Sequence, residues 1–303
     1  MNRQIQALIF FSLIVLSSCT VLTNSQIKNV NAFAGSAKSF SDFPSEVLRK
    51  RSDLVFQEKL VAAIQFPATQ IKRAVSDAQS NYKSQRKQAD SIDLSLKLIQ
   101  QYSILLSKLS SPAYVEDLSK NTDELNENIS DLVTEANKVL PNKIPANVGA
   151  ALTKAIFLVG ERLTKQKQAK ALKEFIPEGE ILIQASVKNL AEALRGDLSQ
   201  LITMDREKFI TTYTNAVLDK PDKVDFNSLQ FYANTLSDYE NLEELRKKCI
   251  DAAEKLGKAH TKLNASIKNK MEVTEIFQET QDLIRSVQDL FKTFKELSSD
   301  KNA

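Results

Sequence analysis

Glycine and proline are scarce in this chain, and tryptophan is absent. The 303 residues include six glycines and seven prolines. Turn-rich β architectures need many of both residues, so their scarcity argues against such folds and favours long helices. The composition therefore predicts an almost wholly helical protein.

Histidine and cysteine are nearly absent as well. His260 is the only histidine, and Gly257 stands three positions before it, where the Glu-x-x-His motif of di-metal bundles has glutamate. A histidine-rich zinc site needs more imidazoles, and no glycine-rich phosphate loop is present. We therefore expect no catalytic, cofactor-binding or metal-binding residues and no cofactor, and interpret His260 as a solvent-facing or seam-edge side chain.

Neither sign of charge predominates. Lysine and arginine number 41 and the acidic residues 38, a formal net charge of +3. Nucleic-acid binders present a clearly basic face. We therefore expect no nucleic-acid partner.

The chain begins with the pattern of a secretory signal. Arg3 supplies a positive charge, and residues 5–16 are apolar but too few to cross a bilayer, which takes about 20. The following stretch, Leu16-Ser17-Ser18-Cys19, resembles the lipobox of bacterial lipoproteins. The resemblance covers only the first 19 residues, and no family is recognised for the helical remainder.

The resemblance implies removal of the signal peptide 1–18 and attachment of diacylglycerol, a palmitate-type modification, to the thiol of Cys19. Acyl chains contribute about 0.8 kcal/mol per buried CH₂, so they would hold the protein on a membrane. In the resembling family Thr20, in place of aspartate, implies transfer from the periplasmic side to the outer membrane where the cell has one. An ordinary cleaved secretory signal and an uncleaved anchor are the alternatives. A lipidated Cys19 would leave Cys249 without a disulfide partner.

Prolines separate the stretches with helical periodicity. Residues 19–41 are small and polar and suit a tether with a short helix near its end, residues 42–298 hold the helices, and residues 299–303 form a frayed tail. Proline fits the first turn of a helix and breaks its middle. We therefore expect helices to start at Pro44 and Pro112, a kink or new start at Pro67, and a helix end before Pro177. The expected helical segments are 44–109, 112–140, 146–175, 183–218, a helix spanning 242–263, and 273–294.

Two segments have the spacing of a coiled-coil seam. The first has apolar residues every seven positions; the second alternates steps of three and four residues. The first seam is Leu118, Leu125, Leu132 and Val139, with Ile129 and Ala136 at the alternate spacing, and the second is Leu242, Leu245, Cys249, Ala252, Leu256, Ala259 and Leu263. We expect Cys249 to be a small buried hydrophobe. The predicted fold is all-α, an elongated antiparallel multi-helix bundle with coiled-coil-like hairpins.

Two adjacent stretches are candidates for contact. Residues 144–160 are apolar with one charge, Lys154, and suit either a central helix buried on all sides or a membrane-inserting element, a layout loosely similar to helical pore-forming toxins. A basic stretch follows, which is either a solvated face or a surface for anionic headgroups or an acidic partner. Its residues are Arg162, Lys165, Lys167, Lys170 and Lys173.

These features favour a lipid-anchored, non-enzymatic binding or scaffold protein of the bacterial cell envelope. It would contact a membrane through the lipid on Cys19 and an envelope protein through helix–helix contacts, with no nucleic acid and no metal. The alternative is a membrane-active protein, pore-forming or remodelling, that uses residues 144–160. An enzyme with an unrecognised site is the third hypothesis.

Overall fold

The protein is all-helical, as the composition predicts. A computed structural model describes residues 22–111, 129–159, 164–269 and 273–299, and these contain no strand. The helices are α2 (Asn24–Phe40), α3 (Pro44–Ala63), α4 (Ala68–Ser110), α6 (Ile129–Val139), α7 (Ala146–Val159), α8 (Lys165–Arg195), α9 (Leu198–Tyr213), α10 (Phe226–Asn269) and α11 (Val273–Ser299). A π-helical turn, Thr214–Leu218, and a 3₁₀ turn, Pro221–Lys223, join α9 to α10.

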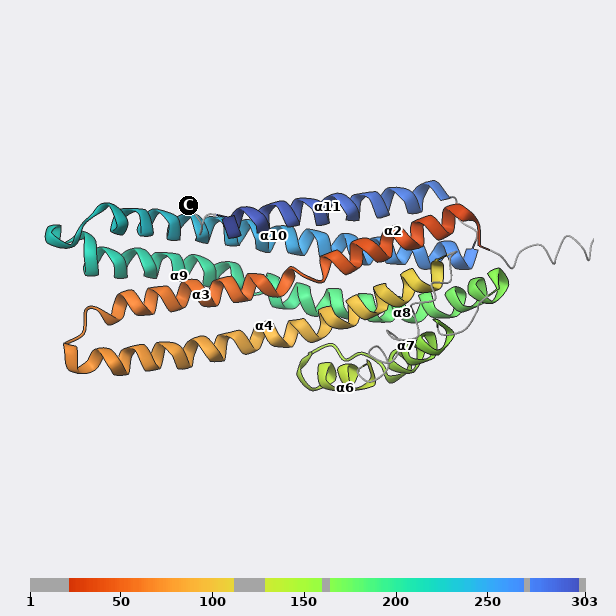
Figure 1. The fold of residues 1–303 in the computed structure, drawn as a ribbon, viewed down its shortest axis with the longest axis horizontal. Helices are drawn as coiled ribbons and strands as arrows, with labels where there is room; N and C mark the ends of the chain where they lie inside the picture. The colour runs from red at the N-terminus through yellow and green to blue at the C-terminus, as the bar shows by residue number, and fades with distance from the viewer. Residues whose placement is uncertain (1–21, 112–128, 160–163, 270–272, 300–303) are drawn as a thin grey trace, which may run out of the picture.

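The long helices lie side by side along the longest axis of the molecule (Figure 1). At 1.5 Å per residue, α4 and α10, with 43 and 44 residues, are each about 65 Å long. The connections from α3 to α4 and from α9 to α10 lie at one end, at the left in Figure 1, and α2 begins at the other. α4 contacts α2, α3 and α8, and α10 contacts α8 and α11.

The segment predicted as a tether is part of the core. Residues Asn24–Phe40 form α2, which starts with a capping box: Thr23 Oγ1 accepts from the Gln26 backbone N–H at 3.2 Å, and Gln26 Oε1 accepts from the Thr23 N–H at 2.9 Å. Phe33 and Phe40 are fully buried. The prediction of a tether to residue 41 is wrong over α2, because these few large side chains share one helix face.

Two predicted helix boundaries are also wrong. α8 continues through Pro177, where a stop was expected, since the residues on both sides of the proline are buried against neighbouring helices. α8 instead begins after the N-cap residue Thr164 and ends at Arg195, with Gly196 as its C-cap residue. Pro67 separates α3 from α4, so it marks a new start.

Every position of the apolar pattern predicted in α10 is buried. Leu242, Leu245, Cys249, Ala252, Leu256, Ala259 and Leu263 are all at most 1% exposed. The start at Pro112 and the seam positions Leu118 and Leu125 lie outside the described residues. On α6 the predicted positions Ile129 and Ala136 are buried and Leu132 is partly buried against the core, whereas Val139 is 49% exposed.

Candidate functional sites

The apolar segment 144–160 forms a peripheral helix. In α7, Val148, Leu152 and Ile156 are buried, whereas Asn147 and Lys154 are exposed. α7 packs against α8 and α6 and lies on the outside of the molecule (Figure 1). The expectation of a helix buried on all sides is therefore wrong. Among the described helices, none combines the length and the apolar character that a membrane span requires.

A groove of about 410 Å³ runs between α7 and α8. Its apolar lining is Ala151, Ala155, Leu158, Ala171 and Phe175. Polar pairs join the two helices across it: Lys154 Nζ lies 2.7 Å from Glu174 Oε2, and Asn147 Nδ2 donates to Glu178 Oε2 at 2.6 Å. The hydrogen bond from Lys154 lowers the pKa of Glu174. The groove thus has an apolar floor with a charged rim.

The predicted basic residues lie at the start of α8, next to this groove. Lys165, Lys167, Lys170 and Lys173 are exposed, and Arg162 lies outside the described residues. Lys165 and Lys167 form no ion pair with any residue that the structure describes. They also stand in the first turn of a helix, where the positive end of the helix dipole repels cations. The described part of this first turn therefore favours a positive potential.

A buried polar site joins α4, α8 and α10. Tyr102 Oη lies 2.6 Å from His260 Nε2, and His260 Nδ1 lies 2.5 Å from Glu180 Oε2. Tyr102 and His260 are fully buried, and the ring of Phe33 packs edge-on against the imidazole. The interpretation of His260 as solvent-facing or seam-edge is wrong. His260 follows Leu256 by four residues, and this spacing on the seam was the signal that the sequence offered.

The environment fixes the protonation of this site. Burial lowers the pKa of His260, so the imidazole is neutral. Burial alone would raise the pKa of Glu180, but hydrogen bonds from His260 and Thr261 bring it below its usual value. Burial, and then the charge of Glu180, raise the pKa of Tyr102. Tyr102 therefore donates to the imidazole, which donates to the carboxylate.

Gly179 makes room for this site. A Cβ at this position would overlap the ring of Tyr102. The glycine therefore lets α8 pack closely against the Tyr102 ring of α4, next to Glu180.

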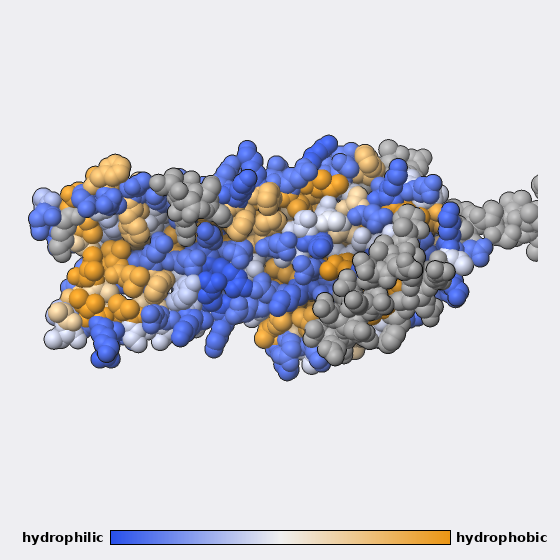
Figure 2. All heavy atoms as spheres, viewed as in Figure 1, coloured by the Kyte–Doolittle hydropathy of each residue, from blue (hydrophilic) through white to orange (hydrophobic). Residues whose placement is uncertain are grey.

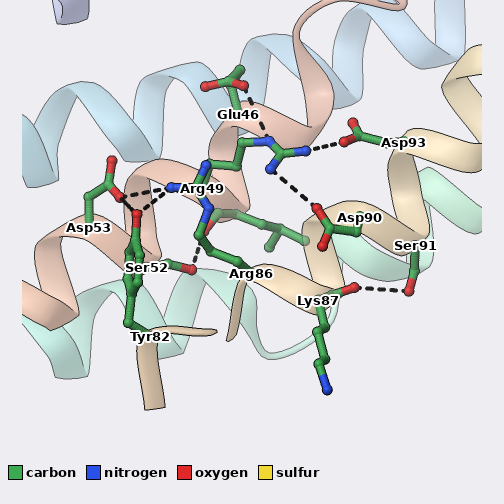
Figure 3. Close-up of polar contacts among 11 residues, drawn as sticks. Glu46, Arg49, Ser52, Asp53, Tyr82, Arg86, Lys87, Asp90, Ser91 and Asp93 are labelled. Carbon is green, nitrogen blue, oxygen red and sulfur yellow. Dashed lines mark hydrogen bonds and ion pairs between the residues drawn. The ribbon is translucent and has the colours of Figure 1, made fainter. Parts of the chain in front are cut away.

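A charged network joins α3 to α4 (Figure 3). The guanidinium of Arg49 lies 3.4 Å from Glu46 and 3.3 Å from Asp90, and it also pairs with Asp93. Next to it, Tyr82 Oη donates to Asp53 Oδ1 at 2.9 Å, and Arg86 pairs with the same carboxylate at 3.3 Å. Each described cation of the network faces acceptors, which favours a structural role.

Exposed apolar side chains gather at the end of the molecule where α3 meets α4 and α9 meets α10. We call them the apolar end: Ile64, Phe66, Phe226, Leu229 and Phe231. Two hydrogen bonds hold these connections together: Gln65 Nε2 donates to the Thr212 carbonyl at 3.2 Å, and Tyr213 Oη donates to the Ser228 carbonyl at 2.7 Å. Apolar surface is visible at this end, at the left of Figure 2. Ile64 is exposed because α3 ends one residue before it.

The structure tests the prediction for one of the two cysteines. Cys249 is buried, as predicted, and burial raises the pKa of its thiol. Cys19 lies outside the described residues, so its lipidation stays a prediction. Within the part of the chain that the structure describes, no group of three or more His, Cys, Asp or Glu side chains is placed to hold a metal ion.

Comparison of the chain with protein-family models, with curated proteins and with solved structures gives no match.

Proposed function

We propose that this protein is a lipid-anchored, non-enzymatic binding module of the bacterial cell envelope. Acylated Cys19 attaches it to a membrane, the outer membrane where the cell has one. Its helices form an elongated antiparallel bundle with coiled-coil-like hairpins, α3–α4 and α10–α11. Its partners are that membrane and an envelope protein, and neither nucleic acid nor metal takes part.

The surface formed by α7 and the start of α8 carries this proposal. Lys165 and Lys167 concentrate positive charge at a helix N-terminus, beside a groove with an apolar floor. An amphipathic helix binds such a groove through its apolar face, and acidic residues on its flank would pair with the lysines. We therefore assign the partner an acidic amphipathic helix.

The burial of reactive groups supports a non-enzymatic role. Tyr102 and His260 have the hydrogen bonds of a proton relay, but both are fully buried among packed side chains. The thiol of Cys249 is buried as well. A substrate would have to open the core to reach any of these groups.

The membrane-active alternative has less support. For residues 144–160 to insert into a bilayer, α7 would have to separate its buried face from α8. Its 14 residues are also fewer than the about 20 that span a bilayer.

The anchor is tested with Cys19→Ser. The natural product should incorporate labelled palmitate, remain with membranes in high salt and show an acylated amino terminus by mass spectrometry. Cys19→Ser should lose the label and appear in the soluble fraction. An unmodified amino terminus in the natural product would contradict the anchor.

The binding surface is tested by photo-crosslinking in the cells that produce the protein. A photoreactive residue at Lys170 should capture one discrete protein, and the combined change Lys165→Gln and Lys167→Gln should reduce that capture about tenfold, through loss of two charge-assisted contacts. A photoreactive residue at Lys295, exposed on α11, is the matched control and should not capture it. Equal capture from both positions would contradict the proposal.

A further inference from the structure

The apolar end exposes more hydrophobic surface than any part of the proposed α7–α8 binding surface. Phe226 is 77% exposed, and Ile64, Leu229, Phe66 and Phe231 are 52%, 48%, 47% and 36% exposed. We infer that the apolar end docks on a lipid bilayer by shallow insertion of Phe66 and Phe226. This inference goes beyond the proposed function, because neither Cys19 nor the α7–α8 surface takes part in it.

None of the segments that the structure describes covers these side chains, because they are exposed in the presence of all of them.

A second copy is a poor occupant because the patch is small. Taking about 200 Å² for a fully exposed large apolar residue, the five side chains expose roughly 500 Å². A stable interface buries about 800 Å² on each partner. A fluid bilayer needs neither a large area nor a complementary shape.

The neighbouring charges indicate how the bilayer would be bound. Lys72 and Lys220 stand beside the two connections together with Asp219 and Asp222. Because both signs are present, anionic lipid gains little over zwitterionic lipid, and burial of apolar area provides the attraction. We therefore expect the apolar end to bind a phosphatidylcholine bilayer about as well as an anionic one.

The position of the apolar end indicates which membrane it would contact. α2 begins at the opposite end of the molecule, so a chain held by the proposed lipid on Cys19 would present the apolar end to a second membrane surface (Figure 1).

The test uses the full chain with Cys19→Ser and a single environment-sensitive fluorophore on Phe226→Cys. The native Cys249 is fully buried and does not compete for the label. Adding phosphatidylcholine vesicles should shift the emission of this fluorophore to the blue. The matched control carries the fluorophore on Met204→Cys, which is 57% exposed on the side of α9, and should not shift. No shift at position 226, or equal shifts at both positions, would overturn the inference.

A second variant measures the contribution of a neighbouring side chain. In the protein labelled at position 226, Phe66→Ser should raise the lipid concentration for a half-maximal shift about fivefold, whereas Met204→Ser should leave it unchanged. Equal effects of the two changes would count against insertion of the apolar end. A concentration-dependent dimer that forms without vesicles and is lost in Phe66→Ser would also overturn the inference, because a second copy would then be the occupant.

Discussion

At the scale of the residue, Gly179 is where the packing leaves no room for a side chain. Gly179→Ala should lower the free energy of unfolding by about 2–3 kcal/mol, because the new methyl group must displace the buried ring of Tyr102. Urea denaturation followed by circular dichroism measures this. Gly35→Ala in α2 is the matched control: its Cβ meets nothing within 4 Å, so it should stabilise by about 0.5–1 kcal/mol. If both changes destabilised the protein, the overlap with Tyr102 would not be the cause of the effect at Gly179.

His260 makes the stability depend on pH in a direction that can be derived. Its pKa is lowered in the folded state, so on acidification the unfolded chain takes up the proton first. The free energy of unfolding should therefore be constant with respect to this group above about pH 6.5 and should fall below it, by up to about 1.4 kcal/mol per pH unit. Glu180, whose folded pKa is also lowered, should add to the loss below about pH 4.5.

The contribution of the imidazole is isolated by His260→Gln. This variant should be less stable than the natural protein at pH 7, but its stability should change less between pH 6.5 and pH 5. Urea titrations at a series of pH values compare the two slopes. Parallel curves would show that His260 does not titrate on unfolding.

At the scale of the element, α2 is the clearest departure from expectation. Phe33→Ala should cost about 3–5 kcal/mol, because Phe33 is fully buried among α4, α10 and α11. Phe277→Ala on α11 is the matched control, since that ring is 53% exposed, and it should cost less than about 1 kcal/mol. Thermal denaturation separates these outcomes. Small and equal effects of the two changes would mean that residues 24–40 are a tether and do not pack in the core.

A second prediction at this scale concerns the contribution of the charged network between α3 and α4 to stability. Arg49→Ala should destabilise by about 1–2 kcal/mol, because it leaves Glu46, Asp90 and Asp93 facing one another without a cation. Arg73 is the control: both it and its partner Asp77 are at least 75% exposed at 4.0 Å, so Arg73→Ala should cost no more than about 0.5 kcal/mol. The free energy of unfolding in low salt measures both.

Periodicity predicted those elements whose apolar stripe is long and regular. The buried positions of α10 between Leu242 and Leu263 followed from spacing alone, because no proline interrupts this stretch and one pattern repeats along it. Pro177 misled the prediction because a proline removes one backbone donor, whereas burial of residues on both sides holds the helix together. α2 was missed because its stripe rests on few large side chains.

At the scale of the whole molecule, sequence patterns specify faces and not neighbours. His260, Tyr102 and Glu180 lie on three helices, and their contact depends on which helices pack together, which no local pattern encodes. The apolar end was hidden for the same reason: Phe66 and Phe226 are 160 positions apart in the sequence, and the α3–α4 and α9–α10 connections lie at one end of the molecule only through the arrangement of α3, α9 and α10. The basic start of α8, by contrast, could be predicted because its lysines lie within nine positions of one another in the sequence.

The arrangement of the long helices can be tested by distances between spin labels, in the full chain with Cys19→Ser. Labels on Phe226→Cys and Lys258→Cys should lie about 48 Å apart, because the 32 residues between them belong to one unbroken helix. Labels on Phe66→Cys and Phe226→Cys should lie far closer, since both positions are at one end of the molecule. Pulsed electron resonance measures both distances, and the buried Cys249 stays unlabelled. A short distance in the first pair would mean that α10 folds back on itself. A long distance in the second pair would mean that the two connections lie far apart and that the apolar end does not exist as one surface.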